Sequence, residues 1–188
     1  MNIGHEALQE MAHARQVPIG LNKAAAVIPR LLENDAGCAP TERSRRLLCC
    51  CARAWPQRVE AFEKLRAAGH AQCDLSERRP FEQLFAAYRR HRFVVSVHGH
   101  GRTDFREWEI LAAGAVPVVS HFAEHDALLE GLPVVRVHDW ATVTPAFLDA
   151  EWERIQREVA RGSISWTKVY FPYWFAQYTE HMSPLLVR

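Results

Sequence analysis

A loop of alternating histidine and glycine at residues 98–101 is the part of this chain whose residue types best suit ligand chemistry. It directly follows an apolar segment at 93–97. Gly99 and Gly101 would let a ligand approach the backbone closely, although glycines also serve ordinary tight turns. His98 and His100 offer ring N–H groups to a phosphate or a sugar. The loop therefore predicts a binding site.

The elements around this loop form one strand–loop–helix–strand unit. The apolar strand is followed by helical spacing over 104–113, with Asp104 at the N-cap, and then by Gly114 and a second apolar strand at 116–120. In open parallel sheets, ligands bind at the carboxyl ends of strands, against helix N-termini. Arg106, in the first helical turn, could bind a diphosphate with two hydrogen bonds or pair with a glutamate on the helix surface. The unit predicts a site for a phosphate-bearing ligand.

The same stretch resembles the exostosin-type glycosyltransferases. Their pattern is a strand, G-x-G, a polar run, R-x-W-E-A-L, a glycine and P-I/V-V. The matching residues here are Gly99, Gly101, Arg106, Trp108, Glu109, Leu111, Gly114, Pro117, Val118 and Val119. The similarity continues through 132–135 and Asp139-Trp140. It covers about residues 45–178, and its specific part is 92–140.

The resemblance implies an α/β fold: a single Rossmann-like parallel sheet with helices on both faces, the donor-binding half of a GT-B glycosyltransferase. It implies that Glu109 accepts hydrogen bonds from the two ribose hydroxyls of a nucleotide diphosphate sugar, a task that suits a carboxylate. The alternative is a solvated glutamate on the helix surface. Gly101 stands where many retaining members carry a second glutamate, which agrees with inverting transfer to a glycan or glycoprotein acceptor.

The predicted donor-binding residues are therefore Gly99, His100, Gly101, Arg106 and Glu109. Trp108 is expected in the core. Inverting transfer also needs a base near the acceptor. The sequence does not identify one, and His121, His125 and Asp126 are the first candidates because they follow the strand at 116–120.

The ten histidines raise an alternative, a metal-dependent hydrolase. Its candidate zinc ligands are His98, His100, His121, His125, Asp104 and Asp126. A pair of histidines without a third ligand at fixed spacing is common by chance. No Asp-x-Asp occurs in the chain, so we expect neither a metal nor another cofactor. The charge of a diphosphate would instead be stabilised by arginine and by a helix N-terminus.

Composition bounds the class of protein. The chain has 188 residues, of which 48% are hydrophobic and 24% charged, and its net charge is +1. These values are ordinary for a soluble domain and give no general attraction to nucleic acid. The N-terminus carries charge and lacks the apolar region of a secretory signal. Exostosin-type enzymes are usually Golgi proteins with an anchor, so the compartment is left open.

The predicted domain organisation is an N-terminal helical extension over 1–44 and a Rossmann-like domain with closing helices over 45–188. Strands are predicted at 46–52, 71–75 and 133–138, and helices at 56–68, 80–91, 123–130, 145–160 and 163–181. Residues 1–44 are too few for a second Rossmann-like domain. One expectation is that the acceptor-binding domain lies elsewhere, so that this chain alone transfers sugar slowly or not at all. The alternative is that the chain is a non-catalytic relative that binds nucleotide sugars.

Five cysteines occur, an odd number with no C-x-x-C pair. Cys49, Cys50 and Cys51 lie in an apolar run, where successive residues of a strand face opposite sides of the sheet. They are predicted to be small core residues, not metal ligands.

Overall fold

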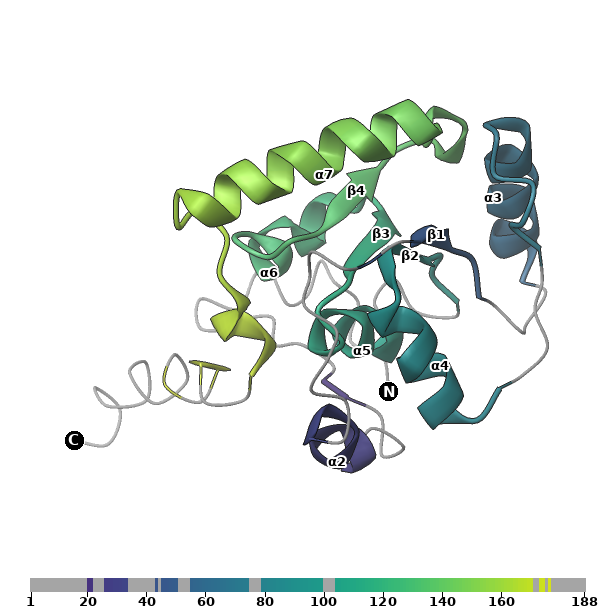
Figure 1. Cartoon of the computed structure of the whole chain (residues 1–188). Coiled ribbons are helices and arrows are strands. Elements are labelled where there is room, and N and C mark those ends of the chain that lie inside the picture. The colour runs from purple at the N-terminus through teal and green to yellow at the C-terminus, as the bar shows by residue number, and fades with distance from the viewer. Residues whose placement is uncertain are drawn as a thin grey trace, which may run out of the picture.

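The computed structural model describes residues 20–21, 26–33, 43, 45–50, 55–74, 79–99, 104–170, 173–174 and 176. In this part of the chain, β1 (Arg45–Leu48), β2 (His91–Ser96), β3 (Val116–Ser120) and β4 (Val135–Val137) form one parallel sheet in the order β1-β2-β3-β4 (Figure 1). The pairing of Phe93 with Val116 and of Val95 with Val118 confirms that β2 and β3 are neighbours. The predicted Rossmann-like parallel sheet is thus confirmed.

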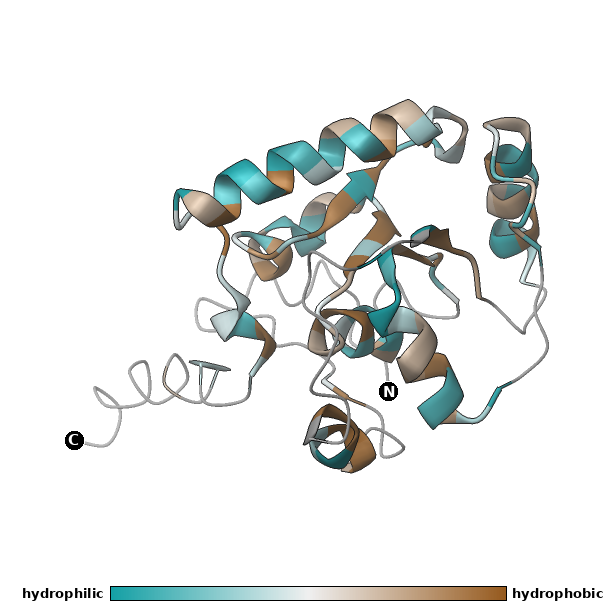
Figure 2. Cartoon of the chain, in the orientation of Figure 1, coloured by the Kyte–Doolittle hydropathy of each residue, from teal (hydrophilic) through white to brown (hydrophobic). Residues whose placement is uncertain are grey.

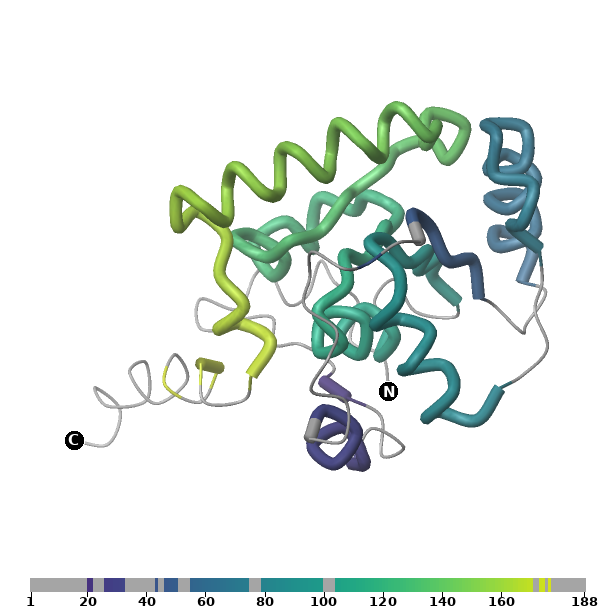
Figure 3. The backbone as a smooth tube through the Cα atoms, viewed as in Figure 1, coloured from purple at the N-terminus to yellow at the C-terminus, as the bar shows by residue number. Residues whose placement is uncertain are grey.

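Helices cover both faces of this sheet. On one face lie α3 (Pro56–Ala67) and α7 (Pro145–Ala160), and on the other lie α4 (Phe81–Arg89), α5 (Phe105–Ala112) and α6 (Asp126–Leu129). Figure 3 shows the backbone passing from β2 through α5 to β3, and from β3 through α6 to β4, before α7 crosses back over the sheet. Among the described strands the order never reverses, so no topological switch point marks a ligand crevice.

The core divides along the two faces of the sheet. Phe93 and Val95 pack against α3 and α7, whereas Val94 faces α4 and α5. This alternation follows from the period of two in a strand, and both sets are apolar because both faces are covered. Figure 2 shows apolar strands at the centre and a hydrophilic outer side on α7. Trp108, which is 2% exposed, packs in a third cluster with α6, which confirms its predicted place in the core.

Shorter elements complete the described part of the chain. They are α2 (Ile28–Glu33), η3 (Ala123–His125), η4 (Trp140–Thr142) and η5 (Trp166–Val169). Ile28 packs with the cluster of α4 and α5, so α2 adds to the core of the same sheet. No helix within the described ranges combines the length and apolar character that a bilayer crossing requires.

The helix at 145–160 is predicted to the residue. Pro145 occupies its first turn, and the hydroxyl of Thr144 accepts a hydrogen bond from the Phe147 N–H at 3.1 Å. Both features stabilise a helix N-terminus, because proline has no N–H to satisfy and a threonine hydroxyl satisfies one of the others.

Other boundaries differ from prediction. The strand predicted at 46–52 ends at Leu48, and residues 71–74 form a turn and not a strand. In that turn the Cys73 N–H donates to the His70 carbonyl, and Arg66 donates to the Cys73 carbonyl at 3.0 Å. The backbone groups of Cys73 therefore do not pair with a neighbouring strand. Residues 166–169 form a 3-10 helix within the predicted closing helix. Most of the helical extension predicted over 1–44 lies outside the described residues, and its described part includes one helix at Ile28–Glu33.

The prediction for the cysteines is wrong in one respect. Cys49 and Cys73 form a disulfide that joins the end of β1 to the turn after α3. The pair could not be predicted from the sequence, because the two residues are 24 positions apart and only tertiary packing brings them together. Cys50 is a buried thiol on the opposite face, as predicted for a small core residue.

We expect Gly114→Ala to lower the free energy of unfolding by about 2–4 kcal/mol. Gly114 has φ +70°, and a Cβ there would lie 2.8 Å from Nη2 of Arg43. That guanidinium donates to the Ala113 and His91 carbonyls at 2.8 and 3.1 Å, so it ties the C-terminus of α5 to β2. Denaturant unfolding measures the change. Gly162→Ala is the matched control, because Gly162 has φ +73° and open space around it; equal losses in the two variants would contradict the role given to Arg43.

Candidate functional site

The carboxyl ends of all four strands meet at one edge of the sheet, because the strands are parallel. The N-terminus of α5 lies at this edge, after the segment that follows β2. Of the five predicted donor-binding residues, Gly99, Arg106 and Glu109 are described, whereas His100 and Gly101 lie outside the described residues. The site can therefore be built from α5 and the elements beside it.

Glu109 is the most informative residue of this edge. It is 7% exposed, and within the described structure its carboxylate takes part in no hydrogen bond and no ion pair. Burial raises the pKa of Glu109 to about 7, and the charge of Arg106 only partly offsets this rise. A buried carboxylate without a partner lowers the stability of a fold. The alternative of a solvated surface glutamate is thus wrong.

Four further polar groups accompany Glu109 on the same side of the sheet. We name the set of Cys50, Tyr88, Ser96, Arg106 and Glu109 the α5 cluster. Burial raises the pKa of the Tyr88 hydroxyl, the charges of Cys50 and Glu109 raise it further, and Arg106 lowers it. Arg106 thus lies near both Tyr88 and Glu109.

The α5 cluster contains a buried hydroxyl, that of Ser96, without a hydrogen bond to any described residue. Tyr88 and Ser96 are at most 1% exposed. The Ser96 hydroxyl has no partner among the described residues, whereas Arg106 lies close enough to the Tyr88 hydroxyl to lower its pKa. Ser96 is the last residue of β2, and Cys50 lies two residues after the end of the neighbouring strand β1. Buried hydroxyls without partners are rare and call for an explanation such as a bound molecule.

The N-terminus of α5 is held differently from the prediction. Asp104 occupies the N-cap position, but its side chain caps no N–H of the helix. Its carboxylate instead accepts a hydrogen bond from Nη2 of Arg58 at 3.2 Å. Glu107 accepts a hydrogen bond from the Asp104 N–H, and burial raises the pKa of Glu107 to about 8. Glu107 is therefore a structural cap, whereas Glu109 on the same helix has no such role.

Arg58 is a residue of this edge that sequence analysis missed. Its side chain is 6% exposed, and its Nε donates to the Val97 carbonyl at 3.0 Å. It links α3 to the end of β2 and to the start of α5. A signal was present, because Arg58 shares the apolar stripe of α3 with Ala61, Phe62 and Leu65 at helical spacing. A charge on such a stripe indicates a buried interaction.

Gly99 has a structural reason to lack a side chain. A Cβ there would lie 3.0 Å from Nη2 of Arg58 and 3.7 Å from Nε1 of Trp55. Nε2 of Gln57 also donates to the Gly99 carbonyl at 2.8 Å. Within the described part of the chain, the groups that approach Gly99 closely are therefore the side chains at the start of α3. A role toward a phosphate stays a prediction.

Histidines gather at the ends of β2, β3 and β4. The rings of His98 and Phe122 are 5.1 Å apart between centroids, and those of His121 and His138 are 4.2 Å apart. Nε2 of His121 lies 3.4 Å from Asp126. The structure thus brings two of the three candidate bases together, His121 and Asp126, whereas the ring of His125 contacts Phe122.

The zinc alternative finds no support in this arrangement. No group of three or more His, Cys, Asp or Glu side chains with the geometry to hold a metal ion occurs in the described ranges. Asp104 is paired with Arg58, and Asp126 is bound by Arg136 at 2.6 Å. His100 lies outside the described residues.

The groups at this edge could bind a ligand that carries hydroxyls and a negative charge. The α5 cluster supplies a carboxylate acceptor, a guanidinium and two hydroxyls, next to the end of a helix whose dipole favours anions. No family model matches the chain, and no curated protein does so either.

Proposed function

We propose that this chain binds a nucleotide diphosphate sugar at the carboxyl edge of its sheet and supports inverting glycosyl transfer, as the donor-binding part of an exostosin-like GT-B glycosyltransferase. The observation that carries the proposal is Glu109, a buried carboxylate that accepts no hydrogen bond from any described residue and stands where the resemblance requires a ribose acceptor. A group that lowers stability without a structural role is best explained by function.

The proposed transfer is the inverting displacement that the resemblance to exostosin-type enzymes implies. The acceptor hydroxyl oxygen forms a bond to the anomeric carbon from the side opposite the diphosphate. The bond from that carbon to the phosphate oxygen breaks, and its electron pair leaves with the diphosphate. Arg106, the N-terminus of α5 and the loop with Gly99, His100 and Gly101 would meet the charge of the leaving group. The hydroxyl proton passes to a base.

The direct test is calorimetry of the whole chain with UDP and GDP, and with uridine and guanosine. We expect at least one diphosphate to bind with a dissociation constant of about 1 mM or tighter, and more tightly than its nucleoside. Absence of binding by both diphosphates at millimolar concentration would reject the donor site. The same titration with the nucleotide sugars identifies the donor.

Arg106→Lys should weaken diphosphate binding about 10-fold and spare the nucleoside. Lysine keeps the positive charge beside Glu109 and Tyr88 but loses the planar fork that binds two phosphate oxygens. Arg106→Ala, in contrast, should also raise the pKa of Glu109, because Arg106 holds that pKa down. Calorimetry at pH 8 distinguishes the two variants; equal losses for nucleoside and diphosphate in Arg106→Lys would place the arginine away from the phosphates.

Nucleotide affinity should survive removal of metal ions. The charge of the diphosphate is met here by arginine and helix dipole, so EDTA should change the dissociation constant by no more than a factor of about two. Elemental analysis of the purified protein provides the complementary measurement. A stoichiometric zinc or manganese that is lost in a His98→Ala/His100→Ala variant would favour the metal-site alternative.

One observation favours a second candidate, a nucleotide-sugar-binding domain without turnover. Arg136 holds the Asp126 carboxylate at 2.6 Å, and this neutralisation weakens the support that Asp126 can give to a proton on His121. Radiolabelled donor with a panel of glycan acceptors separates the candidates. Acceptor-dependent transfer at about 1 per second or faster would establish the enzyme, whereas binding without transfer would establish the second candidate.

A further inference from the structure

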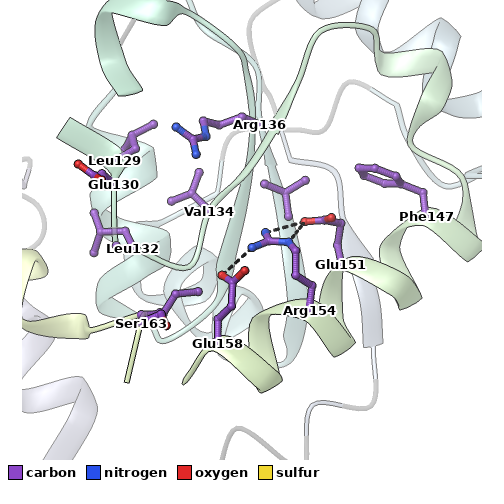
Figure 4. A pocket seen from close by; sticks show the side chains of 13 residues that line it. Leu129, Glu130, Leu132, Val134, Arg136, Phe147, Glu151, Arg154, Glu158 and Ser163 are labelled. Atoms are coloured by element: carbon purple, nitrogen blue, oxygen red, sulfur yellow. Dashed lines mark hydrogen bonds and ion pairs between the residues drawn. The ribbon is translucent and has the colours of Figure 1, made fainter. Parts of the chain in front are cut away.

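A pocket of about 340 Å³ lies between α7 and the edge strand β4, away from the α5 cluster. Its volume falls at the lower end of the range for small-molecule sites. Figure 4 shows Glu151, Arg154 and Glu158 projecting from α7 toward the segment around Val134, with Arg136 across the pocket. None of its lining residues belongs to the α5 cluster or to the segment that follows β2.

Arg154 holds two carboxylates in fixed positions. Its Nε and Nη2 donate to Oε2 of Glu151 at 3.0 and 2.7 Å, and its Nη1 donates to Oε2 of Glu158 at 2.7 Å. The side chains of the three residues are 21–37% exposed. The guanidinium is thus engaged on both sides, while the Oε1 atoms of Glu151 and Glu158 make no hydrogen bond within the described structure.

The balance of polar groups selects the kind of ligand. The lining carries three carboxylates, Glu130 among them, and two guanidinium groups, of which that of Arg136 binds Asp126. Acceptors therefore outnumber available donors, so a ligand must bring hydrogen-bond donors. The excess of carboxylates disfavours phosphates and other anions. Leu132, Val134 and Phe147 give the same pocket an apolar wall.

A neutral molecule with several hydroxyls and an apolar face meets all of these conditions. We propose that the pocket between α7 and β4 binds a neutral saccharide through Glu151 and Glu158, with Phe147 and Val134 against the apolar face of the sugar. This inference rests on the proposed function in one respect. The saccharide would be the part of the glycan acceptor that binds away from the donor. The binding itself does not depend on the donor site.

The test is titration of the whole chain with maltose, cellobiose, lactose and xylobiose, followed by calorimetry or by NMR shifts. We expect at least one of them to bind with a dissociation constant in the millimolar range. Glu158→Ala and Glu151→Ala should each weaken that binding at least about fivefold. Glucose 6-phosphate and glucosamine, as the anionic and cationic probes, should bind more weakly than glucose.

Glu153→Ala is the matched control, since Glu153 also lies on α7 but its side chain is 73% exposed and pairs with Arg157 outside the pocket. It should leave the saccharide affinity unchanged. No saccharide binding up to about 100 mM, equal losses in the control, or preference for the charged probes would overturn the inference. Nucleotide titrations of the same samples keep the two proposals separate: saccharide binding without nucleotide binding rejects only the donor site, and the reverse result rejects only this pocket.

Discussion

Glu109→Gln should make the protein more stable at pH 8 by about 2–4 kcal/mol. The pKa of Glu109 is raised from 4.5 to about 7 in the folded chain. The folded state therefore binds more protons than the unfolded state between these values, and stability falls as pH rises from about 4.5 to about 7. Glutamine removes the ionisation, so the gain should be full above pH 7 and shrink toward zero near pH 4.5. Denaturant unfolding at several pH values measures it.

The same substitution should weaken nucleoside diphosphate binding by about 1–3 kcal/mol, or about 5- to 150-fold. Glutamine has one acceptor oxygen and an NH₂ group in place of two acceptor oxygens, so one ribose hydroxyl would lose its partner. In the wild-type chain, affinity should rise as pH passes through about 7, because the ionised carboxylate accepts from both hydroxyls. Calorimetry between pH 6 and pH 8.5 records both effects.

Glu107→Gln is the matched control on the same helix. Burial also raises the pKa of Glu107, to about 8, so this variant should likewise be more stable at pH 8.5. Its side-chain oxygen can still accept from the Asp104 N–H, and nucleotide affinity should not change. If Glu109→Gln binds nucleotide as well as the wild type does, or if both variants lose affinity equally, Glu109 is not the ribose acceptor.

Arg58→Ala should have the second large effect, a loss of about 2–4 kcal/mol in the free energy of unfolding. The substitution would leave the Val97 carbonyl and the Asp104 carboxylate without the donor that joins them. Because these groups mark the end of β2 and the start of α5, nucleotide affinity should fall as well. Denaturant unfolding and calorimetry of one protein preparation measure both losses.

Lys64→Ala on the same helix is the control for Arg58. Lys64 pairs with Glu60 and Asp139 at 2.9 and 3.3 Å, but its side chain is 40% exposed. Solvent-exposed pairs contribute little to stability, so this variant should unfold and bind much as the wild type does. Comparable losses in the two variants would show that Arg58 acts only through general helix stability.

Sequence reasoning predicted the unit at the centre of the fold well. The apolar runs of β2 and β3 are buried on both faces, so they contain few polar residues and are visible without any structure. Pro145 and Thr144 fix the start of α7 by local chemistry alone. Local signals were less reliable where long-range contacts decide the outcome, as at residues 71–74, where the Cys49–Cys73 disulfide and the bond from Arg66 hold a turn.

By itself, the sequence determined the α/β pattern, the strand–loop–helix–strand unit, and the placement of Arg106 and Glu109 near the start of one helix. These follow from hydrophobic periodicity and from residues close together in the chain. Only the tertiary structure decided that Glu109 is buried without a hydrogen bond to any described residue while Glu107 serves as a cap, and that Arg58 holds the start of α5. The physical reason is that burial and hydrogen bonding depend on which side chains from distant segments meet, and helical periodicity does not record this.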